Sequence, residues 1–256
     1  MGANQPSKSG SRMRIPRFYT PQDLASGALL TLEARASRHL TQVLRLRKGD
    51  ELTLFNGNGF DFRGHIETPL RDGALIRIGE KSEPEARAPL RITLALGISK
   101  GERMDISLQK AVELGVWALQ PLFTERSVVR LRDDRLGKRM QHWHGVVISA
   151  CEQSGRRRLP ALAEPQQLAD WLAQTSGDGL LLDHRSERPL TALTPPAGDS
   201  LTLLVGPEGG LAHQERAMAS AQGFIGVRLG PRAMRTETAP LAAIAAIQSL
   251  WGDFRY

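Results

Sequence analysis

The sequence predicts an α/β protein of two domains, a small β-rich module followed by a larger domain built on a parallel sheet. Two observations predict this architecture. Residues 13–85 contain short runs of alternating polarity joined by glycine-rich turns, whereas apolar runs and helix-like segments alternate throughout residues 89–256. Such alternation is typical of a parallel sheet with helices on both faces. A polar stretch containing Pro84 and Pro89 predicts a linker between the two parts.

The small module is expected to be a barrel-like sheet with one helix. The expected elements, in order, are a helix at 37–47 and strands at 51–55, 60–67 and 74–78. Asn and Gly at residues 56–59 accept positive φ angles and predict a hairpin turn between the first two strands. Residues 1–12 are polar and rich in small residues, so they are interpreted as a disordered tail or an expression remnant.

The elements of the larger domain follow from hydrophobic periodicity and from helix stop signals. The expected strands are 91–98, 118–123, 180–182, 201–205 and 225–229. The expected helices are 103–114, 135–153, 166–174, 211–222 and 240–251. The continuous apolar runs among the strands are typical of a sheet buried on both faces.

Composition restricts the class of protein and its partners. The chain of 256 residues carries a net charge of +7, which favours a polyanionic partner such as nucleic acid. The single cysteine, Cys151, excludes an internal disulfide and suits a reducing cytoplasm. No run approaches the roughly 18 apolar residues of a membrane span. No Cys/His cluster has the spacing of a metal site, so neither a membrane nor a metal is expected.

The first candidate functional segment is the loop at residues 206–210, with the sequence Gly-Pro-Glu-Gly-Gly, directly after an apolar strand. Loops at the carboxyl ends of parallel strands are where α/β folds bind ligands. The three glycines allow the backbone to approach a ligand closely, although a tight structural turn would also use them. Neither G-x-G-x-x-G nor a P-loop pattern is present, so NAD and ATP are not favoured.

The second candidate segment is the loop at residues 229–240, which precedes a helix that is apolar nearly all round. It holds a dense polar cluster that includes Arg235 and Glu237. Thr238 is interpreted as an N-cap for that helix, with Pro240 in its first turn. Capping does not explain the neighbouring arginines and glutamate.

With both loops, the chain resembles the bacterial 16S ribosomal RNA uridine-N3 methyltransferases of the RsmE type, in the SPOUT superfamily of knotted methyltransferases. The resemblance runs along nearly the whole chain. The matching segments are residues 13–18, 39–50, 109–116, 125–127, 152–156, 206–211 and 235–239. Small departures occur at Ala212-His213, where the family commonly has Ser or Thr, and at Ala233-Met234.

The resemblance implies a PUA-like β-barrel domain at 13–85 that binds RNA and a SPOUT methyltransferase domain at 89–256 with a deep trefoil knot. It implies a cytoplasmic homodimer that acts on 16S rRNA within the small ribosomal subunit, with S-adenosyl-L-methionine as cofactor. The residues expected to bind the cofactor are Leu182, Leu204, Val205, Gly206, Pro207, Glu208, Gly209, Gly210, Leu229, Gly230, Arg232, Met234, Arg235, Thr236 and Thr238.

The implied reaction is direct transfer of the cofactor's methyl group to uridine N3. Arg235 is the candidate for stabilising charge on the uracil oxygens, and Glu208 or Glu237 for accepting the N3 proton. Each glutamate fits equally well a structural role in which it only hydrogen-bonds the backbone. The candidates for RNA contacts are Arg17, Arg45, Arg63, Lys100, Arg126, Arg156 and Arg157, although each taken singly also fits a solvated surface residue.

Three alternatives remain open at this point. The first is methylation of another RNA target, such as a ribose 2′-O atom. The second is a non-catalytic RNA-binding factor for ribosome assembly. A nicotinamide-dependent oxidoreductase is disfavoured because the dinucleotide fingerprint is missing.

Overall fold

The structure is a computed structural model that describes residues 15–32, 40, 44, 46–70, 73–127 and 133–255, except for the side chains of residues 133–135. The tail at 1–12, most of the helix expected at 37–47, and the RNA-contact candidate Arg45 lie outside the described residues. The chain divides into two compact units. The first comprises residues up to 56 together with 60–84, and the second comprises 57–59 together with 85–256.

The first unit is a mixed five-stranded sheet with the order β1-β3-β4-β5-β2. Its strands are β1 (Arg17–Tyr19), β2 (Leu29–Thr31), β3 (Glu51–Phe55), β4 (Phe62–Leu70) and β5 (Gly73–Lys81). β1 pairs with β3 in parallel, and the other pairs are antiparallel. Alternate side chains such as Leu52, Leu54, Ile66 and Ile76 are buried in one core. The sequence did not predict β1 and β2, because three residues are too few to display a period of two.

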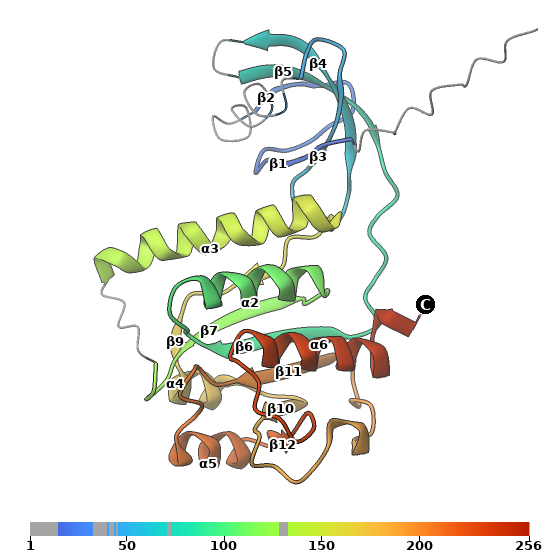
Figure 1. Cartoon of the computed structure of the whole chain (residues 1–256). Coiled ribbons are helices and arrows are strands. Elements are labelled where there is room, and N and C mark those ends of the chain that lie inside the picture. The colour runs from blue at the N-terminus through green and yellow to red at the C-terminus, as the bar shows by residue number, and fades with distance from the viewer. Residues whose placement is uncertain are drawn as a thin grey trace, which may run out of the picture. The chain divides into compact units, whose positions relative to one another are not determined.

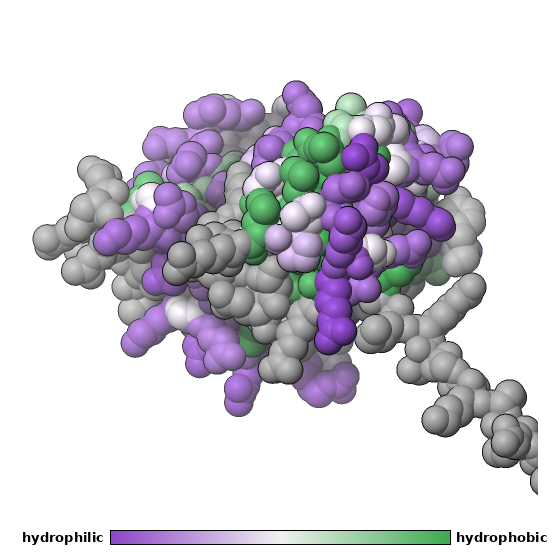
Figure 2. Space-filling model, turned by 90° about the horizontal axis from the view of Figure 1, so that it is seen from above, coloured by the Kyte–Doolittle hydropathy of each residue, from purple (hydrophilic) through white to green (hydrophobic). Residues whose placement is uncertain are grey.

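Apolar side chains also reach the surface of this unit. Leu29 on β2 and Leu70 on β4 are among the exposed large hydrophobic residues. Figure 2 shows one face of the molecule, on which hydrophobic groups gather in a band among hydrophilic side chains.

The second unit is a parallel sheet with the order β12-β10-β11-β6-β7-β8, and β9 also pairs with β7. Its strands are β6 (Arg91–Gly97), β7 (Ala118–Phe123), β8 (Ala161–Leu162), β9 (Gln166–Gln167), β10 (Gly179–Leu182), β11 (Ser200–Val205) and β12 (Ile225–Val227). Its α-helices are α2 (Glu102–Glu113), α3 (Asp133–Ser154), α4 (Leu168–Gln174), α5 (His213–Ala221) and α6 (Thr238–Trp251). Two short 3-10 helices, η2 (Leu190–Ala192) and η3 (Asp253–Arg255), complete the unit.

Helices cover both faces of this sheet, as predicted. On one face, α4 and α5 pack over a buried cluster that includes Ala95, Leu181 and Leu204. On the other face, α2 and α6 lie side by side, and α3 packs on α2 (Figure 1). Within the described part of the chain, no helix combines the length and the apolar character needed to cross a membrane.

The predicted starts of α4, α5 and α6 were wrong by two residues. α5 begins at His213 instead of Leu211, because Ala212 is its extended N-cap residue. Gln166 and Gln167 form β9 instead of a first helical turn, because Gln167 is extended and pairs with Phe123 of β7. α6 begins at Thr238, and no side chain caps it. The carbonyl of Arg235 accepts the N–H groups of Thr238 and Ala239, so a backbone turn starts this helix and the predicted Thr238 cap is wrong.

Candidate active site

A cavity of about 260 Å³ lies at the carboxyl ends of β10, β11 and β12. Its lining comes mainly from residues 181–185, 205–211 and 228–236, each of which continues one of these strands. β10 lies between β11 and β12, although it precedes both in the chain. The chain thus places β11 on one side of β10 and β12 on the other, so the order of strands reverses at β10. Ligands bind α/β sheets at such a switch point.

Most of the residues predicted to bind the cofactor line this cavity. They are Leu182, Val205, Gly206, Pro207, Glu208, Gly209, Gly210, Leu229, Gly230, Arg232, Met234 and Thr236. The lining does not include the other three candidates. Leu204 is fully buried in the core under α4 and α5, Arg235 is exposed, and Thr238 is the first residue of α6.

Close backbone packing at the floor of the cavity requires glycine at two positions. A Cβ atom on Gly206 would lie 2.8 Å from the backbone nitrogen of Leu211. A Cβ atom on Gly97, at the end of β6, would lie 2.5 Å from Cδ of Pro207. Gly97 was not predicted as part of the site, because its only mark in the sequence is a glycine at the end of an apolar strand. The 206–210 loop therefore lies directly against the end of β6.

Glu215 holds the next part of the same segment. Its side chain is buried and accepts hydrogen bonds from the backbone N–H groups of Ala212 and Glu125, each at 2.8 Å. In a capping box the first residue's side chain and the glutamate three residues later each accept a backbone N–H. Ala212 has no side-chain acceptor, so only the hydrogen bond to Glu215 remains. The same carboxylate connects this segment to the loop after β7.

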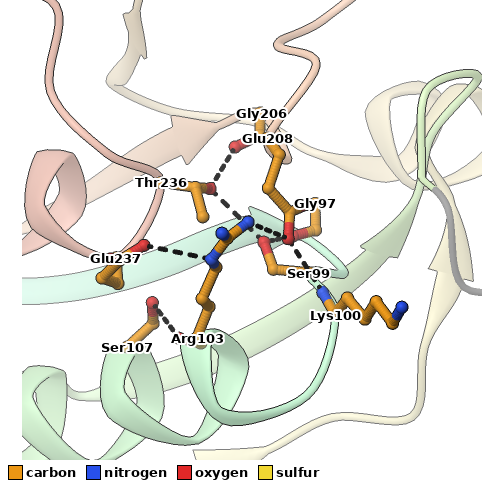
Figure 3. Close-up of polar contacts among 9 residues, drawn as sticks. All are labelled: Gly97, Ser99, Lys100, Arg103, Ser107, Gly206, Glu208, Thr236 and Glu237. Carbon is orange, nitrogen blue, oxygen red and sulfur yellow. Dashed lines mark hydrogen bonds and ion pairs between the residues drawn. The ribbon is translucent and has the colours of Figure 1, made fainter.

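A polar cluster beside the cavity joins the two candidate loops (Figure 3). Arg103, at the start of α2, lies between two glutamates. Its Nη1 is 3.3 Å from Oε1 of Glu208, and its Nε is 3.9 Å from Oε2 of Glu237. Ser99 adds a second connection, because its Oγ lies 3.3 Å from Oγ1 of Thr236. Arg103 and Ser99 were not among the predicted site residues, since nothing in their local sequence shows which loops they contact.

The surroundings of Glu208 keep its carboxylate ionised. Partial burial acts to raise its pKa, but hydrogen bonds from the N–H of Lys100, from its own N–H and from Arg103 outweigh that effect. The pKa of Glu208 is therefore held below its ordinary value. A carboxylate stabilised in this way is a weaker proton acceptor, and its arrangement favours a structural role.

The other two catalytic candidates have different environments. The Glu237 side chain is 17% exposed, and its Oε2 is buried without a hydrogen-bond partner among the described residues. Arg235 is exposed, and its backbone carbonyl forms the turn that starts α6. Glu237 is therefore the glutamate with unused acceptor capacity beside the site.

Arginines form a basic rim on the cavity. Arg185, Arg228 and Arg232 line it and are exposed to solvent. Asp183 pairs with two of the lining arginines, with its Oδ2 3.3 Å from Nε of Arg216 and its Oδ1 3.6 Å from Nη1 of Arg185. The Arg216 side chain is 19% exposed, so its charge is paired within the wall, whereas that of Arg185 is 50% exposed. We use the term basic rim below for the three exposed arginines.

Comparisons with known proteins identify the family. Residues 86–248 match the family described as "RNA methyltransferase domain", and residues 32–79 match the one described as "RNA methyltransferase PUA domain". The "Ribosomal RNA small subunit methyltransferase E" of Buchnera aphidicola subsp. Schizaphis graminum is 34% identical over 243 residues, which cover 94% of this chain and 99% of the relative. The chain belongs to the ribosomal RNA small subunit methyltransferase E family.

Solved structures agree with this membership of the methyltransferase E family. A ribosomal RNA small subunit methyltransferase E from Neisseria gonorrhoeae, bound to S-adenosyl methionine, is 41% identical with a TM-score of 0.87. A structure from Legionella pneumophila, in complex with the bound cofactor SAM, is 37% identical with a TM-score of 0.90. Each match covers 94% of this chain and 100% of the other. The predicted α/β domain with a parallel sheet and the PUA-like domain are confirmed, whereas the trefoil knot stays a prediction.

In this member of the methyltransferase E family, two predicted RNA contacts have structural partners instead. Arg17 forms an ion pair with Asp61, and its side chain is 11% exposed. Arg156 donates to the carbonyls of Val112 and Val116, at the end of α2. Both guanidinium groups are used within their own units, which makes them poor candidates for RNA contacts.

The remaining RNA-contact candidates differ in exposure. Arg63, Lys100 and Arg126 are exposed, while Arg157 is half-buried. Arg126 lies beside the cavity loop, because its Nη1 donates to the carbonyl of Gly209 at 3.0 Å. Lys100 precedes α2 and contacts Glu208 through its backbone N–H, so its ammonium group remains available for an anion.

Proposed function

We propose that this chain is an S-adenosylmethionine-dependent methyltransferase of small-subunit ribosomal RNA, and that its target is N3 of a uridine in 16S rRNA. The observation that carries the proposal is the cavity at the carboxyl ends of β10, β11 and β12, built from the two glycine-marked loops. The structures that bind S-adenosylmethionine in two similar proteins support the cofactor.

The residues of the cavity fit this cofactor. At about 260 Å³ the cavity lies near the lower end of the range of small-molecule sites, which begins at roughly 300 Å³. Leu229 and Met234 supply apolar contacts suited to an adenine ring. The 206–210 loop supplies backbone groups that a ligand can approach closely, since it carries three glycines.

Catalysis depends on positioning and on removal of one proton. When bound, the cofactor supplies a methyl group on sulfonium sulfur, so that the N3–C bond forms while the S–C bond breaks. Uracil N3 carries a proton, which must pass to a base. We assign this role to Glu237, because its Oε2 has no hydrogen-bond partner among the described residues, whereas Glu208 already accepts several hydrogen bonds. Arg235 is positioned next to Thr236 of the lining and is the candidate for stabilising charge on the uracil oxygens.

We assign the binding of RNA phosphates to the basic rim, together with Lys100 and Arg126. The rim borders the cavity, and its guanidinium groups suit phosphate oxygens. The target base must leave its stack to reach the cofactor, so contacts to neighbouring phosphates are required around the cavity mouth. Arg63, on the first unit, is a further candidate.

We infer that the enzyme works as a homodimer, and the outer face of α6 supports this. Ala243, Ile244 and Ile247 bury one face of the helix. The opposite face is apolar at the half-buried Ala242 and Ala245 and also carries the exposed Ser249. A partner surface would remove this apolar face from water. A ribosomal RNA substrate would place the enzyme in the cytoplasm.

The test combines cofactor binding with identification of the methylated atom. Calorimetry measures S-adenosylmethionine binding to the parent and to Gly206→Ala, in which the added Cβ collides with backbone. Labelled cofactor is then supplied with small ribosomal subunits that lack the modification, and the nucleosides are analysed by mass spectrometry. We expect 3-methyluridine. A 2′-O-methylated nucleoside would show that the target atom is the ribose oxygen and not N3. A folded parent that binds RNA but no cofactor would favour a non-catalytic RNA-binding factor.

A further inference from the structure

Arg103 occupies a position that no other described cation shares. It lies in the first turn of α2. Its Nη1 is 3.3 Å from Oε1 of Glu208, and its Nε is 3.9 Å from Oε2 of Glu237. These carboxylates belong to different loops, one after β11 and one before α6. Figure 3 shows the guanidinium group between the two loops.

The two glutamates depend on Arg103 to different degrees. Glu208 also accepts hydrogen bonds from the backbone N–H of Lys100, at 3.0 Å, and from its own N–H. Glu237 has no hydrogen bond to its buried Oε2, and Arg103 is its only ion-pair partner among the described residues. Loss of Arg103 would therefore leave Glu208 held by the backbone, but Glu237 without a cation.

The position of the loop does not depend on this arginine alone. Oγ1 of Thr236 lies 3.3 Å from Oγ of Ser99 and donates to the carbonyl of Gly206 at 3.4 Å. These neutral contacts join the same two loops to the end of β6. The two loops are therefore joined without Arg103, and what Arg103 contributes is the orientation of the Glu237 carboxylate.

We propose that Arg103 is a positioning residue that directs the Glu237 carboxylate toward the substrate base during methyl transfer. This inference rests on the proposed function, in which Glu237 accepts the N3 proton. An acceptor must lie within hydrogen-bond reach of the proton it takes, and such contacts often tighten only in the substrate complex. The 3.9 Å contact leaves room for that movement. The Arg103 side chain is 51% exposed, so it can adjust without repacking a core.

The experiment compares Arg103→Ala, Arg103→Lys, Glu237→Gln and the double variant Arg103→Ala/Glu237→Gln with the full-length parent. Cofactor Kd is measured by calorimetry, and the rate of methyl transfer to small subunits is measured under single turnover. Circular dichroism checks folding. The matched control is Lys110→Ala, which removes another cation from α2 that pairs with a carboxylate, Glu113.

We expect Arg103→Ala to lower the transfer rate by at least about 30-fold while the cofactor Kd changes by less than about threefold, since the effect is on orientation. Arg103→Lys should recover part of the rate, because one ammonium group can reach one carboxylate but not both. The double variant should be no slower than the slower single variant, because both changes remove the same function. The control should match the parent.

Three results would overturn the inference. A transfer rate of Arg103→Ala close to that of the parent would remove any role in the reaction. A cofactor Kd that rises as much as the rate falls would make Arg103 part of the cofactor site. Multiplicative effects in the double variant would mean that Arg103 does not act through Glu237. Failure of the proposed function is distinguishable, because it appears in the parent as a missing or different methylated product.

Discussion

Gly97→Ala tests whether the floor of the cavity depends on contact between β6 and the 206–210 loop. Gly97 does not line the cavity, so the substitution removes no group that touches a ligand. The new Cβ would lie 2.5 Å from Cδ and 2.6 Å from the nitrogen of Pro207. Both atoms belong to a rigid ring and backbone, so neither can move without moving the loop.

The size of the effect follows from these distances. Ordinary contact between carbon atoms is about 3.5–4.0 Å, so the loop must move by roughly 1 Å. Overpacking of this kind costs about 1–3 kcal/mol. Each 1.4 kcal/mol that appears in binding changes Kd about tenfold. We therefore expect the Kd for S-adenosylmethionine to rise by about 5- to 140-fold if the whole cost appears in binding.

Calorimetry on the folded variant measures the change in Kd, and urea denaturation measures the free energy of unfolding. Gly198→Ala is the matched control, because a Cβ there meets nothing within 4 Å. If Gly97→Ala binds the cofactor as tightly as the parent does, while both remain folded, then the contact with Pro207 does not position the loop and the reasoning fails.

Four other variants, one of them a double substitution, test separate parts of the structure. Ala245→Glu, on the half-buried outer face of α6, should convert a dimer to monomers in sedimentation experiments; a monomeric parent would contradict the dimer. The lowered pKa of Glu208 stabilises the folded state above the ordinary pKa of 4.5, and this contribution is lost as the pH falls through the folded value. The parent should therefore lose more unfolding free energy than Glu208→Gln between neutral and acidic pH, and equal losses would refute the assignment. Gln248→Ala should lower the free energy of unfolding by about 1–3 kcal/mol in urea denaturation, because the buried amide donates to a carbonyl at the end of α2. Charge reversal of Arg228 and Arg232 should weaken RNA binding and make its salt dependence shallower in filter-binding titrations, whereas an unchanged salt slope would exclude the basic rim.

Local sequence patterns predicted most of the fold because each element carries its own signal. The strand at 118–123 and the strand at 51–55 have the predicted bounds, since apolar spacing and flanking turns define both. β9 was mistaken for helix because only its pairing with β7 makes it a strand. Such pairing joins distant parts of the chain and leaves no local mark.

The candidate site was predictable where close backbone packing requires glycine. The 206–210 loop stands out by its glycines, and the fold places it in the cavity lining. Arg103 and Gly97 were missed because their importance lies in what they meet across the sheet. Arg17 was overestimated for the same reason, since its partner Asp61 is 44 residues away.

The cavity is assembled from the ends of three strands that are separated by long stretches of chain, so a partly folded protein has no version of it. Only the completely folded second unit can therefore bind the ligand, and a higher ligand concentration shifts the unfolding equilibrium toward the folded state. By thermodynamic linkage, cofactor at 100 times its Kd would add about 2.7 kcal/mol to the free energy of unfolding. Cells that deplete the methyl donor would thus expose the free enzyme to more frequent unfolding and to proteolysis, which couples the amount of enzyme to the supply of its cofactor.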